Sequence, residues 1–361
     1  MDAVLGKTTR KVVDTVLDRI AAGVYHRGEN LGSEVALAKS FQASRTTIRR
    51  AMEYLCSTGV VERNPGVGFS VLLSSDGVKR SVRPRLLLIR AADSPLNNEI
   101  FCGVMNAPEA RYYDISVLDA TGSNGNYAEL LNNLPETIGN IMIFPMELPG
   151  IREGIQSVLK RGVNLIQLDR CLEGIDAPSI MFDNYSGACA AVRHLHSEHS
   201  GPVYFLGGGE VPASAAKRFA GWRDTMAEFG YDDFEHYRIA PEGVAEYDYN
   251  IEHFRPVLDH FFTDHREPVA IFAVCDHLAR CVYSWAKMAG RQIGRDIFVV
   301  GFDDLAFCSR LSPTLSSVAA SRFLLGEEAI RLLSSGKLIP GWRQLIPVQL
   351  VIRQSSRRQL Y

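Results

Sequence analysis

The sequence predicts an α/β protein in which three helices and a β-hairpin precede a two-lobed α/β domain with parallel sheets. Near the N-terminus, apolar residues recur at helical spacing, and two short strands around a turn follow them. From residue 85 onward, short apolar strands alternate with amphipathic helices, a pattern typical of parallel sheets with right-handed crossovers. This pattern continues for roughly 275 residues, too many for one comfortable sheet, so we expect two lobes.

The first 73 residues carry the pattern of a winged helix-turn-helix. A helix is predicted over residues 9–22, and a short second helix begins after Ser33. A third helix begins after Ser44, which is a good N-cap, and it stops at Gly59. A β-hairpin with its turn at residues 64–66 completes the unit. In such a fold the third helix normally enters the major groove of DNA, so we expect a DNA-binding domain over 1–73.

The remaining chain divides into a linker and the two-lobed domain. Residues 74–84 are polar, contain Gly and Pro and lack apolar periodicity, which indicates a linker. We expect the two-lobed domain over 85–361. Its strands are predicted at 86–89, 115–118, 141–144, 164–168, 202–206, 269–274 and 297–302, and its helices include 151–161, 186–197, 215–229 and 276–289.

The stretch SRTTIRR, residues 44–50, places hydroxyls and guanidinium groups at the start of the third helix. A helix N-terminus with such groups suits phosphates and base edges. A solvated basic face would have the same composition, so the stretch alone leaves both interpretations open.

Charge is distributed unevenly along the chain. The whole chain has a formal charge of −2, but residues 1–85 hold 14 Lys+Arg and 8 Asp+Glu, which gives +6 there and −8 in the remainder. A basic N-terminal region on an acidic body favours nucleic-acid binding by that region alone, since the body repels phosphate.

The sequence contains no signal for a membrane, a disulfide framework or a metal. There is no signal-peptide pattern at the N-terminus and no bilayer-spanning apolar stretch, so we expect a cytoplasmic protein. The seven cysteines are odd in number and include no C-x-x-C pair, which argues against disulfides and structural zinc. We therefore expect neither a metal nor a cofactor.

Three patterns suggest catalytic, metal or cofactor sites but lack the rest of their motifs. Ser214–Lys217 has S-x-x-K spacing, yet no S-D-N or K-T-G follows. The three histidines within 194–199 do not share a helix face, and the glycines at 207–209 lack the spacing of a dinucleotide loop. We expect no enzyme, because no nucleophile–base set is present.

Residues 28–71, GENLGSEVALAKSFQASRTTIRRAMEYLCSTGVVERNPGVGFSV, resemble the GntR family of bacterial transcription regulators. They follow the family order Leu-Pro-Ser-Glu-Arg-x-Leu-Ala, Val-Ser-Arg-x-Thr-Val-Arg-x-Ala and Gly-x-Gly-x-x-Val. They depart at Gly32, where the family has Pro, and at Val35 and Val67, where it often has basic residues; losing two cations should weaken phosphate binding. The resemblance implies DNA contacts by Ser44, Arg45, Thr46, Thr47, Arg49, Arg50 and Gly66.

Nearly all of 85–356 resembles the effector domain of the LacI/GalR family, which is related to periplasmic sugar-binding proteins. The matching stretches are LDRCLEGIDAPSIMFDNYSGACAAVRHL (168–195), KRFAGW (217–222), FAVCDHLARCVYSWAKMAGRQIGRDIFVVGFDDLAFCSRLSPTLSSV (272–318) and LIPVQLVIRQSS (345–356).

The resemblance implies a set of ligand-binding residues. Arg218 matches the family's effector-gripping arginine, whose fork can hold two sugar hydroxyls or a carboxylate. Asp303 matches a ligand-binding aspartate at a strand end. Asp276 matches the Asp of an Asn-Asp pair whose Asn is replaced here by Cys275. The other candidates are Ser214, Asp93, Ser94, Met146 with its neighbour Pro145, and Tyr247.

A GntR-type head on a LacI-like body resembles regulators of the arabinose-repressor type. The resemblance implies a homodimeric repressor of a double-stranded DNA operator, controlled by a small molecule between the lobes, with a monosaccharide as first choice. An activator, a corepressor-dependent repressor and a pure sugar-binding protein are the alternatives. The change to Cys275 also leaves a non-sugar ligand open.

Overall fold

The chain folds into two compact units. One comprises Met1–Leu86 with the short segments Arg111–Ser116 and Thr137–Gly139, and the other comprises the remaining residues. The computed structural model describes residues 6–57, 59–72, 85–90, 95–119, 127–135, 138–145, 149–207, 213–240, 250–265 and 268–358. The predicted linker, 74–84, lies outside these ranges, so the predicted domain limits remain predictions. In the ranges given, no helix is long and apolar enough to cross a membrane.

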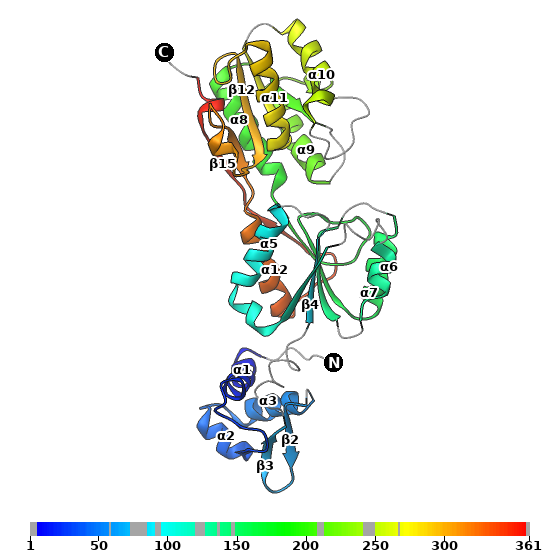
Figure 1. The fold of residues 1–361 in the computed structure, drawn as a ribbon, viewed down its shortest axis with the longest axis vertical. Coiled ribbons are helices and arrows are strands. Elements are labelled where there is room, and N and C mark those ends of the chain that lie inside the picture. Colours follow the sequence, from blue (N-terminus) through cyan, green and yellow to red (C-terminus); the bar gives the residue numbers. More distant parts are fainter. Residues whose placement is uncertain are drawn as a thin grey trace. The chain divides into compact units, whose positions relative to one another are not determined.

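The N-terminal unit contains the predicted three helices and hairpin (Figure 1). Its three-stranded antiparallel sheet has the order β1-β3-β2. The apolar positions spaced at helical intervals, such as Val16, Ile20, Ile48 and Leu55, are fully buried and form the core between the helices. The elements are α1 (Lys7–Ala21), β1 (Asn30–Gly32), α2 (Glu34–Ser40), α3 (Arg45–Ser57), β2 (Val61–Asn64) and β3 (Gly68–Val71).

The close approach of β1 and β3 explains Gly32, where the GntR pattern has proline. Gly32 has φ +95°, whereas a proline ring fixes φ near −65°. Gly68, its neighbour across the sheet, has φ +121°, and an added Cβ would lie 2.2 Å from the Gly32 carbonyl oxygen. Both glycines are therefore required by the path of the backbone at this strand pair.

The larger unit is built on two six-stranded sheets, both mostly parallel as predicted. Only the first residues of three strands, Arg85–Leu86, Asp114–Ser116 and Ile138–Gly139, are assigned to the other unit. The first has the order β14-β8-β7-β6-β4-β5 and the second β10-β9-β11-β12-β13-β15, where β15 pairs antiparallel to β13. The strands of the first sheet are β4 (Arg85–Arg90), β5 (Asp114–Asp119), β6 (Ile138–Ile143), β7 (Asn164–Leu168), β8 (Ser179–Phe182) and β14 (Arg343–Ile346). Those of the second are β9 (Val203–Leu206), β10 (Arg238–Ile239), β11 (Val269–Ala273), β12 (Ile297–Asp303), β13 (Ser316–Ala319) and β15 (Gln349–Val351).

Helices cover both sheets (Figure 1). Beside the first sheet, α5 packs on α12 and α6 packs on α7; in the second, α8 packs on α9 and α10 on α11. The α5–α12 contact is close because Gly103 and Gly326 carry no side chain. A Cβ on Gly103 would lie 1.9 Å from the Phe323 carbonyl oxygen, and a Cβ on Gly326 would lie 2.1 Å from the Ile100 carbonyl oxygen. The helices are α5 (Pro95–Asn106), α6 (Tyr127–Asn132), α7 (Ile151–Lys160), α8 (Asn184–His199), α9 (Ala213–Glu228), α10 (Ile251–Asp264), α11 (Asp276–Ala289) and α12 (Arg322–Ser335).

The chain passes between the two sheets at the connections β8–β9, β13–β14 and β14–β15. Helix α12 follows β13 of the second sheet but packs on α5, β7 and β8, which belong to the first. Its first residue, Arg322, therefore stands where the chain leaves one sheet for the other.

Candidate functional site

Ser44 caps α3 as predicted. Its Oγ accepts a hydrogen bond from the Thr47 backbone N–H at 3.1 Å and lies 2.8 Å from Thr47 Oγ1. Arg45, Thr46, Arg49 and Arg50 are exposed at the start of the helix, while Thr47 is half-buried. The cap thus fixes the point from which these side chains project.

Replacing Ser44 with alanine should destabilise the N-terminal unit by about 1 kcal/mol, because the first turn of α3 loses the acceptor for the Thr47 N–H. Chemical denaturation followed by circular dichroism would measure the change. Ser40→Ala, an exposed serine at the end of α2, is the matched control and should leave stability unchanged. Equal effects of the two substitutions would contradict the capping role.

Glu34 joins three elements of the N-terminal unit, and sequence reasoning missed it. Its Oε2 accepts from Arg49 Nε on α3 and its Oε1 from Arg63 Nη2 on β2, both at 3.4 Å. The Glu34 side chain is 12% exposed, but those of Arg49 and Arg63 are 56% and 68% exposed. Both guanidinium groups therefore remain accessible while one carboxylate limits their orientation.

The positions where this chain departs from the GntR pattern lie on the surface. Val35 and Val67 are 57% and 56% exposed, on α2 and in the hairpin turn. Gly66, the predicted contact in that turn, is exposed with φ +80°. Having valine at these two positions therefore lowers the positive charge of the surface and changes no contact in the core.

In the larger unit, two of the predicted ligand-binding residues meet at the end of β12. Arg218 Nη2, from α9, donates to Asp303 Oδ1 at 3.1 Å. Arg322 Nη2, from the start of α12, donates to the same oxygen at 3.1 Å. The Asp303 side chain is 10% exposed and both arginine side chains are 8% exposed. We call these three residues the Arg–Asp–Arg cluster.

Further contacts hold Arg218 in place. Its Nε donates to Asn184 Oδ1 at 2.8 Å, and its Nη1 donates to the Val274 carbonyl oxygen at 2.7 Å. The Phe302 ring lies against the guanidinium group, 3.7 Å from its Cζ to the ring centroid. The start of α8, the end of β11 and the end of β12 thus fix the orientation of the Arg218 side chain. A residue that recognises a ligand needs to be held in this way.

Asp303 is held as a carboxylate. Burial alone would raise its pKa, but the charges of Arg218 and Arg322 outweigh burial and hold the pKa of Asp303 below its ordinary value. Its backbone has φ +108°, uncommon for a residue with a side chain. Strain of this kind clusters at functional sites and is maintained by the surrounding contacts.

Asp276 lies beside the cluster but is fully buried. Its Oδ1 accepts from Ser317 Oγ at 2.6 Å and its Oδ2 from the Leu305 N–H at 2.7 Å. It therefore anchors the turn after β12, and the ligand contact expected for it remains a prediction. Its neighbour Cys275 is also buried, and burial raises the pKa of the Cys275 thiol to about 12, so this side chain is a neutral thiol.

Burial, followed by the charge of Asp303, raises the pKa of Asp276 from 3.8 to about 7. The folded state therefore binds this proton more tightly than the unfolded state, and the resulting stability is complete below pH 3.8 and lost as pH rises through about 7. Asp276→Asn cannot ionise, so from pH 5 to pH 8 its free energy of unfolding should rise relative to the wild type by about 2 kcal/mol. Denaturation curves at both pH values would measure this; parallel pH profiles would contradict it.

The other predicted ligand residues are placed only in part. Ser214 is half-buried on α9, four residues before Arg218 and so on the same helix face. Pro145 is buried just after β6. Asp93, Ser94, Met146 and Tyr247 lie outside the described residues, and their roles remain predictions.

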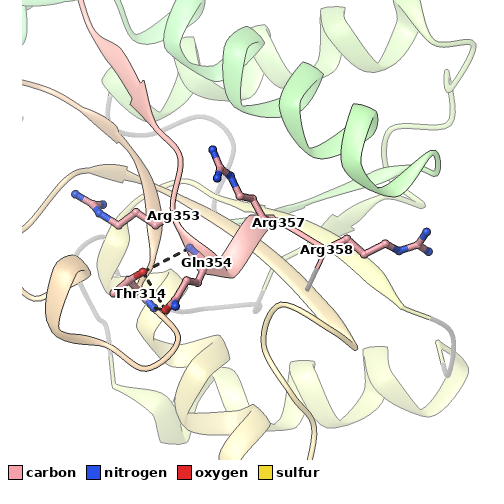
Figure 2. Close-up of a pocket in the computed structure, with 5 residues that line it drawn as sticks. All are labelled: Thr314, Arg353, Gln354, Arg357 and Arg358. Carbon is pink, nitrogen blue, oxygen red and sulfur yellow. Dashed lines mark hydrogen bonds between the residues drawn. The ribbon is translucent and has the colours of Figure 1, made fainter. Parts of the chain in front are cut away.

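A separate pocket of about 560 Å³ lies near the C-terminus, lined by Thr314, Arg353, Gln354, Arg357 and Arg358 (Figure 2). The three arginine side chains point in different directions, and Arg353 is already paired with Asp304 at 2.7 Å. None of the predicted ligand residues lines this pocket. In the part of the chain that the structure describes, no group of three His, Cys, Asp or Glu side chains is arranged to hold a metal.

Comparison with known proteins identifies both parts of the chain. Residues 8–71 match the bacterial regulatory proteins of the gntR family, and residues 192–356 match the periplasmic binding protein-like domain. The HTH-type transcriptional repressor CytR of Escherichia coli (strain K12) is 23% identical over 299 residues, which span 81% of this chain and 84% of that protein.

Solved structures share the fold of the larger unit. A LacI family transcriptional regulator from Enterococcus faecium with bound ribose aligns with a TM-score of 0.61 and 17% identity, over 76% of this chain and 100% of that chain. The complex of the transcriptional regulator CelR with cellobiose aligns with a TM-score of 0.64 and 17% identity, over 96% and 98%. The two-lobed α/β fold expected from the sequence is confirmed.

Proposed function

Since residues 8–71 form a GntR-family domain and residues 192–356 a periplasmic binding protein-like domain, we propose that the chain is a DNA-binding transcriptional repressor controlled by a sugar. The observation that carries the proposal is the buried Arg218–Asp303 pair at the end of β12. Ligands of parallel α/β folds bind outside the carboxyl ends of the strands, where this pair lies. The relative CytR is a transcriptional repressor, and two regulators with the same fold have structures with bound ribose and with cellobiose.

The proposed DNA site is the start of α3. Arg45 and Arg49 would contact base edges or phosphates, and Thr46 and Thr47 phosphate oxygens or thymine methyl groups. Ser44 caps the helix, Arg50 adds a further cation, and Gly66 forms the turn of the wing. Two such heads in a homodimer would read the two halves of a palindromic operator.

The proposed signal is a change in the relation between the two sheets of the larger unit. A sugar held by Arg218 and Asp303 favours the lobe arrangement to which it binds more tightly, by no more than the difference in affinity. Because α12 starts at the Arg–Asp–Arg cluster and packs on the first sheet, it connects the ligand site to both lobes.

Release of DNA on addition of sugar would test this function. DNA that the full chain selects from a random pool would be titrated with protein, with and without ribose, ribose 5-phosphate, arabinose, cellobiose and glucuronate. We expect one of these to release the wild type, whereas Arg218→Ala should still bind DNA but no longer respond, because it lacks the donor to the ligand and to Asp303.

Arg193→Ala is the matched control, because Arg193 is an exposed arginine paired with Glu228 on the same unit. It should respond as the wild type does. Thermal unfolding would confirm that Arg218→Ala is folded. Release of Arg218→Ala at wild-type sugar concentrations would contradict the assigned site, and tighter DNA binding on addition of sugar would identify a corepressor.

A further inference from the structure

The Arg–Asp–Arg cluster holds more hydrogen-bond donors than the protein satisfies. Two guanidinium groups carry ten N–H donors, of which five are engaged: three of Arg218, to Asn184, Val274 and Asp303, and two of Arg322, to Asp303 and the Ala320 carbonyl oxygen. The bond to Ala320 is long, at 3.5 Å. Five N–H groups thus have no acceptor among the described residues. Both side chains are 8% exposed, and neither has a nitrogen that is both fully buried and without a partner, so these N–H groups remain accessible to a ligand.

The charges around Arg322 come from several elements. Asp303 on β12 is in direct contact, while Asp169 after β7 and Glu99 on α5 act at longer range. Asp169 is half-buried and Glu99 is exposed, and the structure gives neither a hydrogen bond to Arg322. Asp276 has both oxygens engaged by Ser317 and Leu305. Two buried cations therefore share one buried, directly bonded carboxylate oxygen.

This arrangement is better suited to an anion than to a neutral sugar. Each hydroxyl of a neutral sugar brings a donor together with its acceptor, whereas a carboxylate or phosphate group offers only acceptors at neutral pH. A guanidinium group pairs with such an oxyanion through two parallel hydrogen bonds, which are stronger than neutral ones. An oxyanion would also offset the positive charge of the two buried guanidinium groups, which adds to the free energy of binding.

We propose that Arg322 is a further effector-binding residue and that, with Arg218, it binds an oxyanion carried by the sugar. The proposal rests on the function above and specifies the class of its effector: a sugar acid or a sugar phosphate. Arg218 stands on α9, beside the second sheet, and Arg322 opens α12, which packs on the first. One anionic group held by both would connect the two sheets.

Binding to the full chain would be measured by calorimetry with matched probes. These are glucose, glucuronate and glucose 6-phosphate, together with ribose and ribose 5-phosphate. We expect at least one of the acidic compounds to bind at least tenfold more tightly than the neutral sugar from which it derives. Comparing glucuronate with glucose 6-phosphate shows whether a carboxylate or a phosphate group fits the cluster. In Arg322→Met this preference should fall by about tenfold or more, while Arg322→Lys should retain part of it.

Arg331→Met is the control, since Arg331 lies on the same helix, is 42% exposed and pairs with Glu327 and Glu328. It should bind as the wild type does. A neutral sugar that binds as tightly as its acidic forms, or an unchanged preference in Arg322→Met, would overturn the proposal while leaving the sugar-controlled repressor standing. If no member of the panel binds, the proposed anionic class fails, and the DNA-release experiment above decides the sugar assignment separately.

Discussion

Asp303→Ala should lower the free energy of unfolding by about 3–5 kcal/mol, because two buried guanidinium groups lose the carboxylate that they share. An unpaired buried charge costs far more than the pair itself contributes, since water no longer solvates it. Asp303 also ends β12, so its loss removes the point at which α9 and α12 are joined. Urea denaturation of the purified variant would measure the change.

Glu228→Ala is the matched control for Asp303→Ala. Glu228 also pairs with an arginine, Arg193, but its side chain is 55% exposed, and exposed pairs contribute about 0–1 kcal/mol. Adding an oxyanion that binds the cluster should restore part of the stability of Asp303→Ala, because the anion supplies the missing charge. A loss no larger than that of Glu228→Ala would show that Asp303 does not hold the two arginines.

Arg49→Ala should weaken binding to the selected operator by about 1–3 kcal/mol while leaving sugar binding unchanged. Arg49 projects from the first turns of α3, its side chain is 56% exposed, and its contact with Glu34 is a long one at 3.4 Å. The guanidinium group can therefore turn to a base edge at little cost. Fluorescence anisotropy with labelled operator and calorimetry with the sugar would measure the two activities.

Random DNA of equal length separates base contacts from phosphate contacts at Arg49. If Arg49 contacts a base edge, Arg49→Ala should weaken binding to the operator more than binding to random DNA. If Arg49 contacts a phosphate, the substitution should weaken binding to both DNAs alike. Arg193→Ala, in the other unit, should change neither. A variant that loses sugar binding as well would contradict the division of labour between the two units.

The sequence by itself determined the features that depend on local pattern. Apolar spacing predicted α1, α3 and seven of the twelve strands of the two sheets, because a regular spacing of apolar residues turns one side of an element toward the core; these strands are β4, β5, β6, β7, β9, β11 and β12. Ser44 was recognisable as a cap from its type and position. Arg218 and Asp303 were found through their motifs, although they lie 85 residues apart. The strands β8, β10, β13, β14 and β15 were not predicted from pattern. Ser179, Ser316 and Ser317 are buried polar residues that interrupt the apolar runs of β8 and β13. β10 has only two residues, and β14 and β15 lie at sheet edges with one buried residue and none.

Only the tertiary structure decided which charged groups meet. Arg322 reaches Asp303 because α12 begins at a passage between the sheets, and Glu34 reaches Arg49 and Arg63 because α2, α3 and β2 pack together. Asp276 matched a binding motif, but packing buried it and supplied both of its donors. The type and spacing of residues indicate local conformation, whereas the burial and partners of a residue depend on elements that are distant in the sequence. The chemistry of the Arg–Asp–Arg cluster could therefore be determined only from the folded chain.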